Sequence, residues 1–144
     1  MKNSLLFFAF VFSGSFALQA QVTQINSNQN LTPVAPLQNG KIILVSDIDS
    51  TLWVTDGTLV GTLQLSNTIT YKDAGSLLGP TYIFKGTTAA TGIEVFKTDG
   101  TVIGTSLVSD INPTNASSIP DADFATLNGF AYFTASRPAE GREL

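Results

Sequence analysis

The stretch "WVTDGTLVGTLQLS" (residues 53–66) has a second copy further along the chain, "FKTDGTVIGTSLVS" (residues 96–109). When the two stretches are aligned with the two residues before each, at an offset of 43, seven of sixteen positions are identical, and Trp53 aligns with Phe96. A turn sequence that recurs at a fixed spacing indicates a repeated structural unit. We therefore expect the 144-residue chain to be built from copies of one small unit.

The Asp-Gly pair of each copy predicts a tight turn between two strands, because glycine adopts positive φ angles at little cost. The aspartate can accept a hydrogen bond from the backbone N–H two residues later. The second glycine, Gly61 or Gly104, is expected to allow another left-handed residue or a β-bulge. At least one residue of each aliphatic pair, 59–60 and 102–103, is expected to pack on a neighbouring unit. The residues expected to build the repeat are Trp53, Asp56, Gly57, Thr58, Gly61, Thr62, Glu94, Phe96, Asp99, Gly100, Thr101, Gly104 and Thr105.

Elsewhere, short β-branched, aromatic and aliphatic runs alternate with Gly, Asp, Asn and Pro. No stretch after the first 20 residues keeps apolar residues at helical spacing for three turns, so an all-β fold is predicted. Repeats of about 40–50 residues with several strands are typical of propeller blades. We therefore predict β-propeller-like blades of short antiparallel strands in an incomplete array. Within each unit the outer strand is expected last, which places that of the second unit at residues 123–127.

Three units are expected after residue 36: two repeats at about 37–78 and 79–127, and the start of a third at 128–144. The third unit is indicated by the final "GREL", which matches "GIEV" at residues 92–95. The sequence is therefore expected to be a fragment of a longer repeat array.

The first 20 residues have the layout of a secretory signal peptide: Lys2, an apolar run over residues 5–18, and Ala20 at the cleavage position. The apolar run is too short for a membrane span, which needs about 20 residues. Residues 21–36 are expected to form an extended polar leader that includes at most one edge strand. The sequence thus predicts a secreted or cell-surface protein with no membrane span once the signal peptide is removed.

The chain contains no cysteine and no histidine, which excludes disulfides, thiolate metal sites and any Ser-His-Asp arrangement. The net charge is −4, so no basic patch is expected to bind nucleic acid. Glu94 and Glu143 occupy equivalent positions of the repeat, which favours a framework hydrogen bond or ion pair, for example with Lys97 or Arg142, over catalysis. We therefore predict that the chain is not an enzyme and needs no cofactor.

Two pairs of aspartates lie two residues apart, as in many cation-binding loops: Asp47 with Asp49, and Asp121 with Asp123. Neither pair has the glycine and glutamate of a complete EF-hand loop, so calcium at these residues stays a secondary hypothesis. Trp53 and the aromatic residue at its matched position are able to stack on sugar rings. Their equivalence in the repeat favours packing between units instead.

The stretch "EVFKTDGTVIGTSLVSDINP" (residues 94–113) resembles ELWKTDGTxxGTxLVKDIxPG, the repeat of the ELWxxDGT or hyalin-like repeat family. That repeat recurs in secreted proteins of Bacteroidetes and cyanobacteria. The first copy departs from the pattern, with Thr51 in place of Glu and "LQLSNTI" in place of "LVKDI". The resemblance implies a β-propeller-like array in an exported or cell-surface protein, often one with a sorting domain for type IX secretion.

The sequence and the resemblance together predict a secreted, non-catalytic structural module of the adhesion type that binds an extracellular protein or glycan. The resemblance supplies no catalytic residue. Two alternatives stay open at this point: a carbohydrate-binding segment of a larger exported enzyme, and a calcium-stabilised adhesin.

Overall fold

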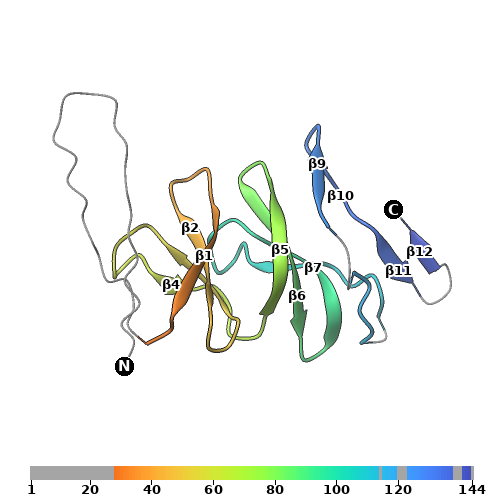
Figure 1. Ribbon diagram of the computed structural model, residues 1–144, viewed down its shortest axis with the longest axis horizontal. Coiled ribbons are helices and arrows are strands. Elements are labelled where there is room, and N and C mark those ends of the chain that lie inside the picture. The colour runs from red at the N-terminus through yellow and green to blue at the C-terminus, as the bar shows by residue number, and fades with distance from the viewer. Residues whose placement is uncertain (1–27, 114, 120–122, 138–140, 144) are drawn as a thin grey trace.

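The computed structural model describes residues 28–113, 115–119, 123–137 and 141–143. Every regular element among these residues is a β-strand, so the all-β prediction is confirmed. The strands form two four-stranded antiparallel sheets and two antiparallel pairs, arranged in a row along the long axis of the molecule (Figure 1).

The first sheet is a simple meander, in which each strand pairs with the next one along the chain. Its turns need residues that tolerate positive φ, and they contain Gly40 at 80° and Ser50 at 58°. The strands are β1 (Leu31–Pro36), β2 (Ile42–Ser46), β3 (Leu52–Thr55) and β4 (Leu63–Gln64).

The second sheet repeats the first, strand for strand, and its four strands are β5 (Thr70–Leu78), β6 (Thr81–Thr88), β7 (Thr91–Thr98) and β8 (Ser106–Ser109). Leu44 lies opposite Trp53 in the first sheet, and Phe84 lies opposite Phe96 in the second. The next strand pair follows the same pattern, because Trp53 lies opposite Gln64 and Phe96 opposite Leu107. The two sheets are therefore equivalent in strand order and in register.

The two remaining pairs begin the same pattern again, and their strands are β9 (Ala125–Leu127), β10 (Phe130–Tyr132), β11 (Ala135–Arg137) and β12 (Gly141–Glu143). Leu127 lies opposite Phe130, as Leu78 lies opposite Thr81 in the second sheet. In the β11–β12 pair Ala135 lies opposite Glu143, as Gly86 lies opposite Glu94 at the same offset of 49, but the register shift that follows Gly86 is not repeated.

The expected order of strands within a unit is wrong. The segment 123–127 contributes β9, which pairs with β10 and not with the second sheet. The second sheet has β5 at the edge that precedes its buried strands, and β8 at the other edge. In the first sheet β1 takes the place of β5, as the edge strand expected within residues 21–36. The physical reason is local: Asn128 and Gly129 have φ of 53° and 78°, the pattern of a two-residue hairpin turn that pairs β9 with its neighbour.

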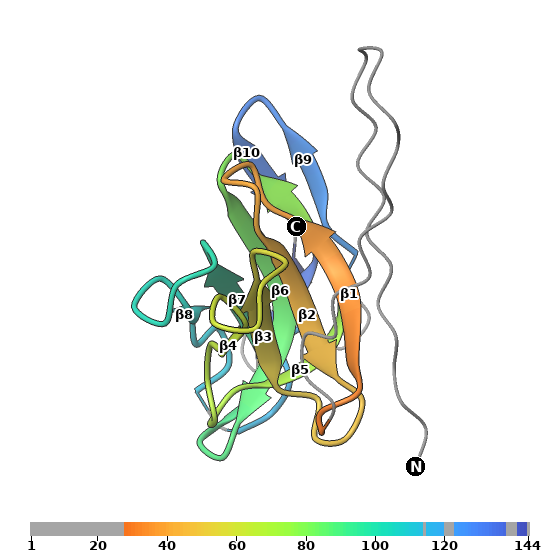
Figure 2. The same cartoon turned by 90° about the vertical axis from the view of Figure 1, so that its left-hand side faces the viewer.

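The main hydrophobic core lies between the two sheets, which lie one behind the other in Figure 2. Phe84 is its centre, with ring centroids 5.9 Å from Phe96, 5.9 Å from Tyr82 and 5.8 Å from Tyr71. The facing residues of the first sheet and its connections are Ala35, Leu37, Ile43, Leu52, Val54, Leu65 and Ile69. Burial of these side chains is the main force that holds the sheets together.

A smaller cluster covers the other face of the second sheet. Val95 of β7 and Ile119 are buried there, and Phe124 and Phe133 pack against them with ring centroids 5.5 Å apart. Phe133 follows Phe84 at the offset of 49, so the beginning of the third unit packs on the second sheet as the second packs on the first.

Trp53 and Phe96 have the same register but different surroundings. Phe96 is buried between the sheets. Trp53 is half-buried on the opposite face of the first sheet, where its Nε1 donates to Thr51 Oγ1 at 3.1 Å. Since Phe96 faces a preceding sheet and Trp53 does not face one among the described strands, the same position gives core packing in one unit only.

Candidate functional site

The two Asp-Gly-Thr turns join β3 to β4 and β7 to β8; we call residues 55–62 the first corner and residues 98–105 the second corner. In the first corner, Asp56 Oδ1 accepts from the N–H of Thr58 at 2.9 Å and from its Oγ1 at 2.7 Å. Thr58 Oγ1 accepts in turn from the N–H of Gly61 at 2.9 Å. One carboxylate and one hydroxyl therefore fix the backbone between Asp56 and Gly61.

Threonines at both ends of the corner close the network. Thr62 Oγ1 donates to the carbonyl oxygen of Thr58 at 2.6 Å. Because that bond uses the single hydroxyl proton of Thr62, Thr55 is the donor in the 2.8 Å contact between Thr55 Oγ1 and Thr62 Oγ1. Thr55 Oγ1 also accepts from the N–H of Gly57 at 3.0 Å.

The second corner repeats this network bond for bond, with no distance differing by more than 0.1 Å from its counterpart. The participating residues are Thr98, Asp99, Gly100, Thr101, Gly104 and Thr105. Six of the seven positions that are identical in the two copies thus make the network; the seventh, Ser66 and Ser109, lies outside it.

The two glycines of a corner are required for different reasons. Gly57 and Gly100 have φ of 90° and 83°, as the Asp-Gly signal predicts. Gly61 and Gly104 do not have positive φ, so the expected left-handed residue is wrong for them. A Cβ at Gly61 would lie 2.0 Å from Asp56 Oδ1, and one at Gly104 equally close to the carboxylate of Asp99. The second glycine makes room for the carboxylate.

Replacing Gly104 with alanine is expected to lower the melting temperature by several degrees, because the added methyl displaces the Asp99 carboxylate from its two bonds to Thr101. Thermal unfolding followed by circular dichroism measures the effect. In an Asp99→Ala background the same Gly104→Ala substitution should have little further effect, since no carboxylate is left to displace. Additive effects of the two substitutions would contradict this explanation.

Hydrogen bonding lowers the pKa of both corner carboxyls below their ordinary value of 3.8. For Asp56 the main cause is the hydroxyl of Thr58, and the backbone N–H of the same residue adds to it. For Asp99 the hydroxyl of Thr101 is again the largest cause. Both bonds favour the charged form of the carboxyl.

This lowering of the pKa predicts a loss of stability in acid. A folded-state pKa below the unfolded value stabilises the fold above about pH 4, and the contribution disappears as the pH falls through the folded-state pKa. Urea unfolding at about pH 6 and about pH 3 should therefore show a lower free energy of unfolding in acid. The Asp56→Asn/Asp99→Asn variant keeps the acceptors without the charge and should show a smaller decrease; an unchanged decrease would contradict the assignment.

The aliphatic pairs at the tips of the corners do not pack on a neighbouring unit, so that expectation is wrong for the described residues. Val60 is 88% exposed and Ile103 is 97% exposed, and Leu59 and Val102 are also exposed. The hydrogen-bond network explains this exposure. The threonine hydroxyls at both ends of the corner bond within the turn, so the aliphatic pair between them lies on the outside.

The second corner is seated on the first sheet, at a surface that we call the seat: Leu37, Asn39 and Lys41 of the β1–β2 loop and Val54 of β3. A Cβ at Gly100 would lie 2.7 Å from Leu37 Cδ1, so this glycine is also required for close approach. Asn39 Nδ2 donates to the carbonyl oxygen of Asp99 at 3.3 Å. The sequence analysis missed the seat, although a leucine shortly before an Asn-Gly pair occurs both at residues 37–40 and, with one residue fewer, at residues 127–129.

Glu94 has a framework position. It is fully buried on β7, and its Oε2 accepts from the backbone N–H of Ile111 at 3.2 Å and from the hydroxyl of Ser118. Its Oε1 has no hydrogen-bond partner within the part of the chain that the structure describes. Lys97 is exposed, so Glu94 is tied to the connection after β8 and not to that lysine.

The acidic pairs are engaged in local hydrogen bonds or lie outside the described residues. Asp47 accepts from Thr32 Oγ1 at 2.9 and 3.1 Å. Asp49 Oδ1 accepts from the hydroxyl of Thr51 at 2.8 Å and from its N–H at 3.1 Å, and these bonds lower the pKa of Asp49. Asp123 is exposed, and Asp121 lies outside the described residues. No three His, Cys, Asp or Glu side chains of the described residues gather as a metal site would require.

No family model matches the chain, and neither a curated protein nor a solved structure matches it. Among the described residues there is no helix with the length and apolar character that a membrane crossing needs. The corner networks leave their aspartates and threonines bonded within the turn, so what each corner presents to its surroundings is the exposed aliphatic pair.

Proposed function

We propose that this chain is a non-catalytic binding module of a secreted or cell-surface protein, built from units of the ELWxxDGT type. The exposed tips of the two corners carry this proposal. Both tips hold an aliphatic pair that the fold does not bury, and the two pairs occupy equivalent positions. Exposed apolar groups at repeated positions mark an interaction surface rather than a structural need.

An extracellular protein is the partner that this surface favours. The tips offer Leu59 with Val60 and Val102 with Ile103, and both corners lie on the same side of the molecule in Figure 2. Aliphatic side chains gain free energy by desolvation against another apolar surface. Sugar rings are bound mainly by stacking on aromatic faces together with polar groups, and the tips have neither.

The experiment is binding of the labelled full chain to arrays of extracellular matrix proteins and of glycans. The proposal expects binding to at least one immobilised protein and loss of that binding in the Val60→Ser/Ile103→Ser variant, at an unchanged melting temperature. Binding to glycans alone would support the carbohydrate-binding alternative. Absence of binding on both arrays, or binding that the substitutions leave intact, would contradict the proposal.

A calcium-stabilised adhesin differs in its response to the cation. The melting temperature of the full chain would then rise with added calcium and fall again with a chelator. Because Asp47 and Asp49 already bind threonine groups, we expect no such response. Export is tested separately, by fusing residues 1–27 to a reporter protein and measuring its appearance outside the cell.

A further inference from the structure

The contact between the second corner and the first sheet shows how one unit holds the next. Gly100 lies over Leu37, which is only 5% exposed as a result, and the amide of Asn39 caps the carbonyl oxygen of Asp99. On the side of the sheet the contact uses the leucine and the asparagine of the β1–β2 loop. On the side of the corner it requires a glycine, because a Cβ there would overlap the leucine.

Two positions of the seat, those of Leu37 and Lys41, have apolar counterparts at the other end of the molecule with no corner on them. Leu127 flanks the β9–β10 turn as Leu37 flanks the β1–β2 turn, because Leu127 pairs with Phe130 and the N–H of Leu37 donates to the carbonyl oxygen of Lys41. The β9–β10 turn is one residue shorter, and its Asn128 has a φ of 53°, so the two turns share their flanking residues and not the position of the asparagine. Leu127 is nevertheless 61% exposed. We call Leu127 and Phe130 the open seat.

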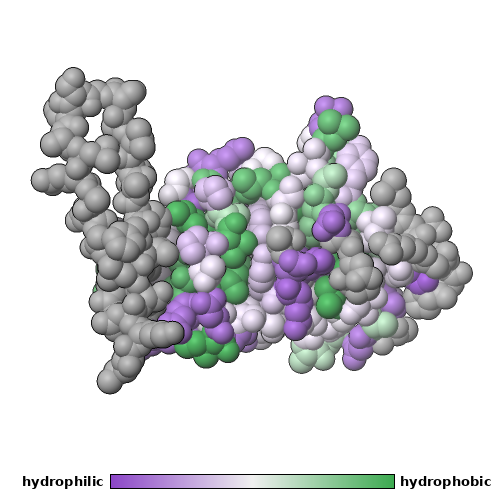
Figure 3. All heavy atoms as spheres, in the orientation of Figure 1, coloured by the Kyte–Doolittle hydropathy of each residue, from purple (hydrophilic) through white to green (hydrophobic). Residues whose placement is uncertain are grey.

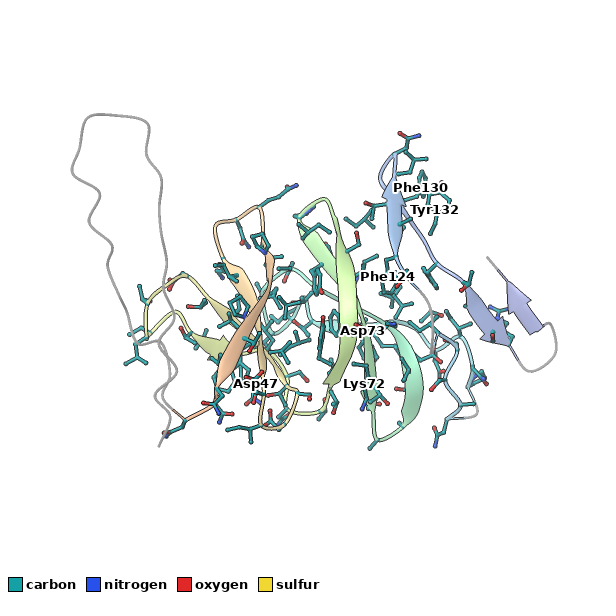
Figure 4. The ribbon with its side chains drawn as sticks, viewed as in Figure 1. Asp47, Lys72, Asp73, Phe124, Phe130 and Tyr132 are labelled. Carbon is teal, nitrogen blue, oxygen red and sulfur yellow. The ribbon has the colours of Figure 1, made fainter. Side chains whose placement is uncertain are left out.

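Hydrophobic atoms are visible at the projecting tip of the β9–β10 hairpin in Figure 3. Phe130 and Tyr132 extend from this hairpin in Figure 4 and are 65% and 44% exposed. Phe130 pairs with Leu127 across the two strands, so it has the position that Lys41 has in the β1–β2 hairpin. In the occupied seat the aliphatic stem of Lys41 lies beside Gly100. Removing these three large apolar side chains from water by contact with another surface would be favourable in free energy.

The first corner is the complementary element. Its network matches that of the second corner. A Cβ built at Gly57 would have nothing within 4 Å, whereas a Cβ built at Gly100 would lie 2.7 Å from Leu37 Cδ1. The first corner belongs to the sheet at one end of the row and the open seat to the hairpin near the other end, so the two do not meet within one molecule (Figure 1). Each molecule therefore has a corner without a seat and a seat without a corner among its described residues.

We propose that two copies of this chain associate head to tail, with the first corner of one copy on the open seat of the other. Gly57 then covers Leu127, and Phe130 lies beside it where Lys41 lies beside Gly100 in the occupied seat. The β5–β6 turn is a poorer partner, because Leu78 is half-buried there and Thr81 stands where the β9–β10 hairpin has Phe130. Contact between unlike surfaces is heterologous, so each dimer keeps one corner and one seat for further copies.

Association is tested by sedimentation equilibrium of the full chain over a range of concentrations, with the average mass expected to rise as the concentration rises. Leu127→Asp removes the open seat, and Gly57→Asn adds a side chain where the leucine must fit while keeping a residue that tolerates positive φ. Each variant alone is expected to stay monomeric. The control Ile103→Asp changes a more exposed apolar residue outside both surfaces and should associate like the unmodified chain.

Mixing the two monomeric variants is the sharper experiment. Leu127→Asp keeps an intact first corner and Gly57→Asn keeps an intact open seat, so an equimolar mixture should form a dimer and nothing larger. An unmodified chain that is monomeric at every concentration, a Leu127→Asp chain that still associates, or a mixture that stays monomeric would each overturn the proposal. The tip substitutions Val60→Ser and Ile103→Ser leave this association intact, which separates it from binding of another protein.

Discussion

Replacing Phe84 with alanine is expected to destabilise the protein by about 3–5 kcal/mol, the range for a buried phenylalanine in a packed core. Its side chain is fully buried between the two sheets and its ring contacts Tyr82 and Phe96. Alanine leaves a cavity at the centre of the contact that holds the first sheet on the second. Urea unfolding, followed by the fluorescence of Trp53, the single tryptophan, measures the change.

The matched control is Phe130→Ala, which removes the same side chain from a position that is 65% exposed. At a concentration where the chain is monomeric, its effect should lie within about 0.5 kcal/mol of zero. Equal effects of Phe84→Ala and Phe130→Ala would mean that the sheets do not pack through this ring.

Replacing Gly100 with alanine is expected to cost about 2–4 kcal/mol, the sum of two penalties. A φ of 83° strains any residue with a Cβ, by roughly 1–2 kcal/mol. The new methyl would also lie 2.7 Å from Leu37 Cδ1, so the corner must lift from its seat or the leucine must move. Chemical unfolding of the variant measures the sum.

Gly57→Ala is the control, since φ is 90° there and nothing lies within 4 Å of the new methyl. We expect only the strain of roughly 1–2 kcal/mol. In a Leu37→Ala background, Gly100→Ala should cost no more than Gly57→Ala, because the overlapping methyl is gone. Equal costs of the two glycine substitutions in the unmodified chain would show that the second corner is not seated.

Local sequence signals predicted the all-β fold and part of the corner. The positive φ at Gly57 and Gly100 and the bond from Asp56 to the N–H two residues on follow from Asp-Gly-Thr alone. The Asn128-Gly129 pair carries the same kind of turn signal, but the sequence analysis placed residues 123–127 in the second unit and so did not pair β9 with β10. These features depend on residues close together in the chain.

Contacts between distant residues could not be predicted from the same signals. The need for Gly61 depends on where the Asp56 side chain turns, and the seat joins residues 60 positions apart. Lys85 looks exposed in sequence, yet it is buried and forms an ion pair of 2.9 Å with Asp73 across the β5–β6 pair. Trp53 and its equivalent differ because burial is decided by the neighbouring sheet and not by the repeat.

The most direct measurement of the seated corner is a nuclear Overhauser spectrum of the isotope-labelled chain at a concentration where it is monomeric. The Cβ position at Gly100 lies 2.7 Å from Leu37 Cδ1, so an α proton of Gly100 should give a strong cross-peak to a Leu37 methyl. The equivalent proton of Gly57 should give no cross-peak to any leucine methyl beyond its own corner. Absence of the Gly100–Leu37 cross-peak would contradict the claim that one repeated corner joins successive units.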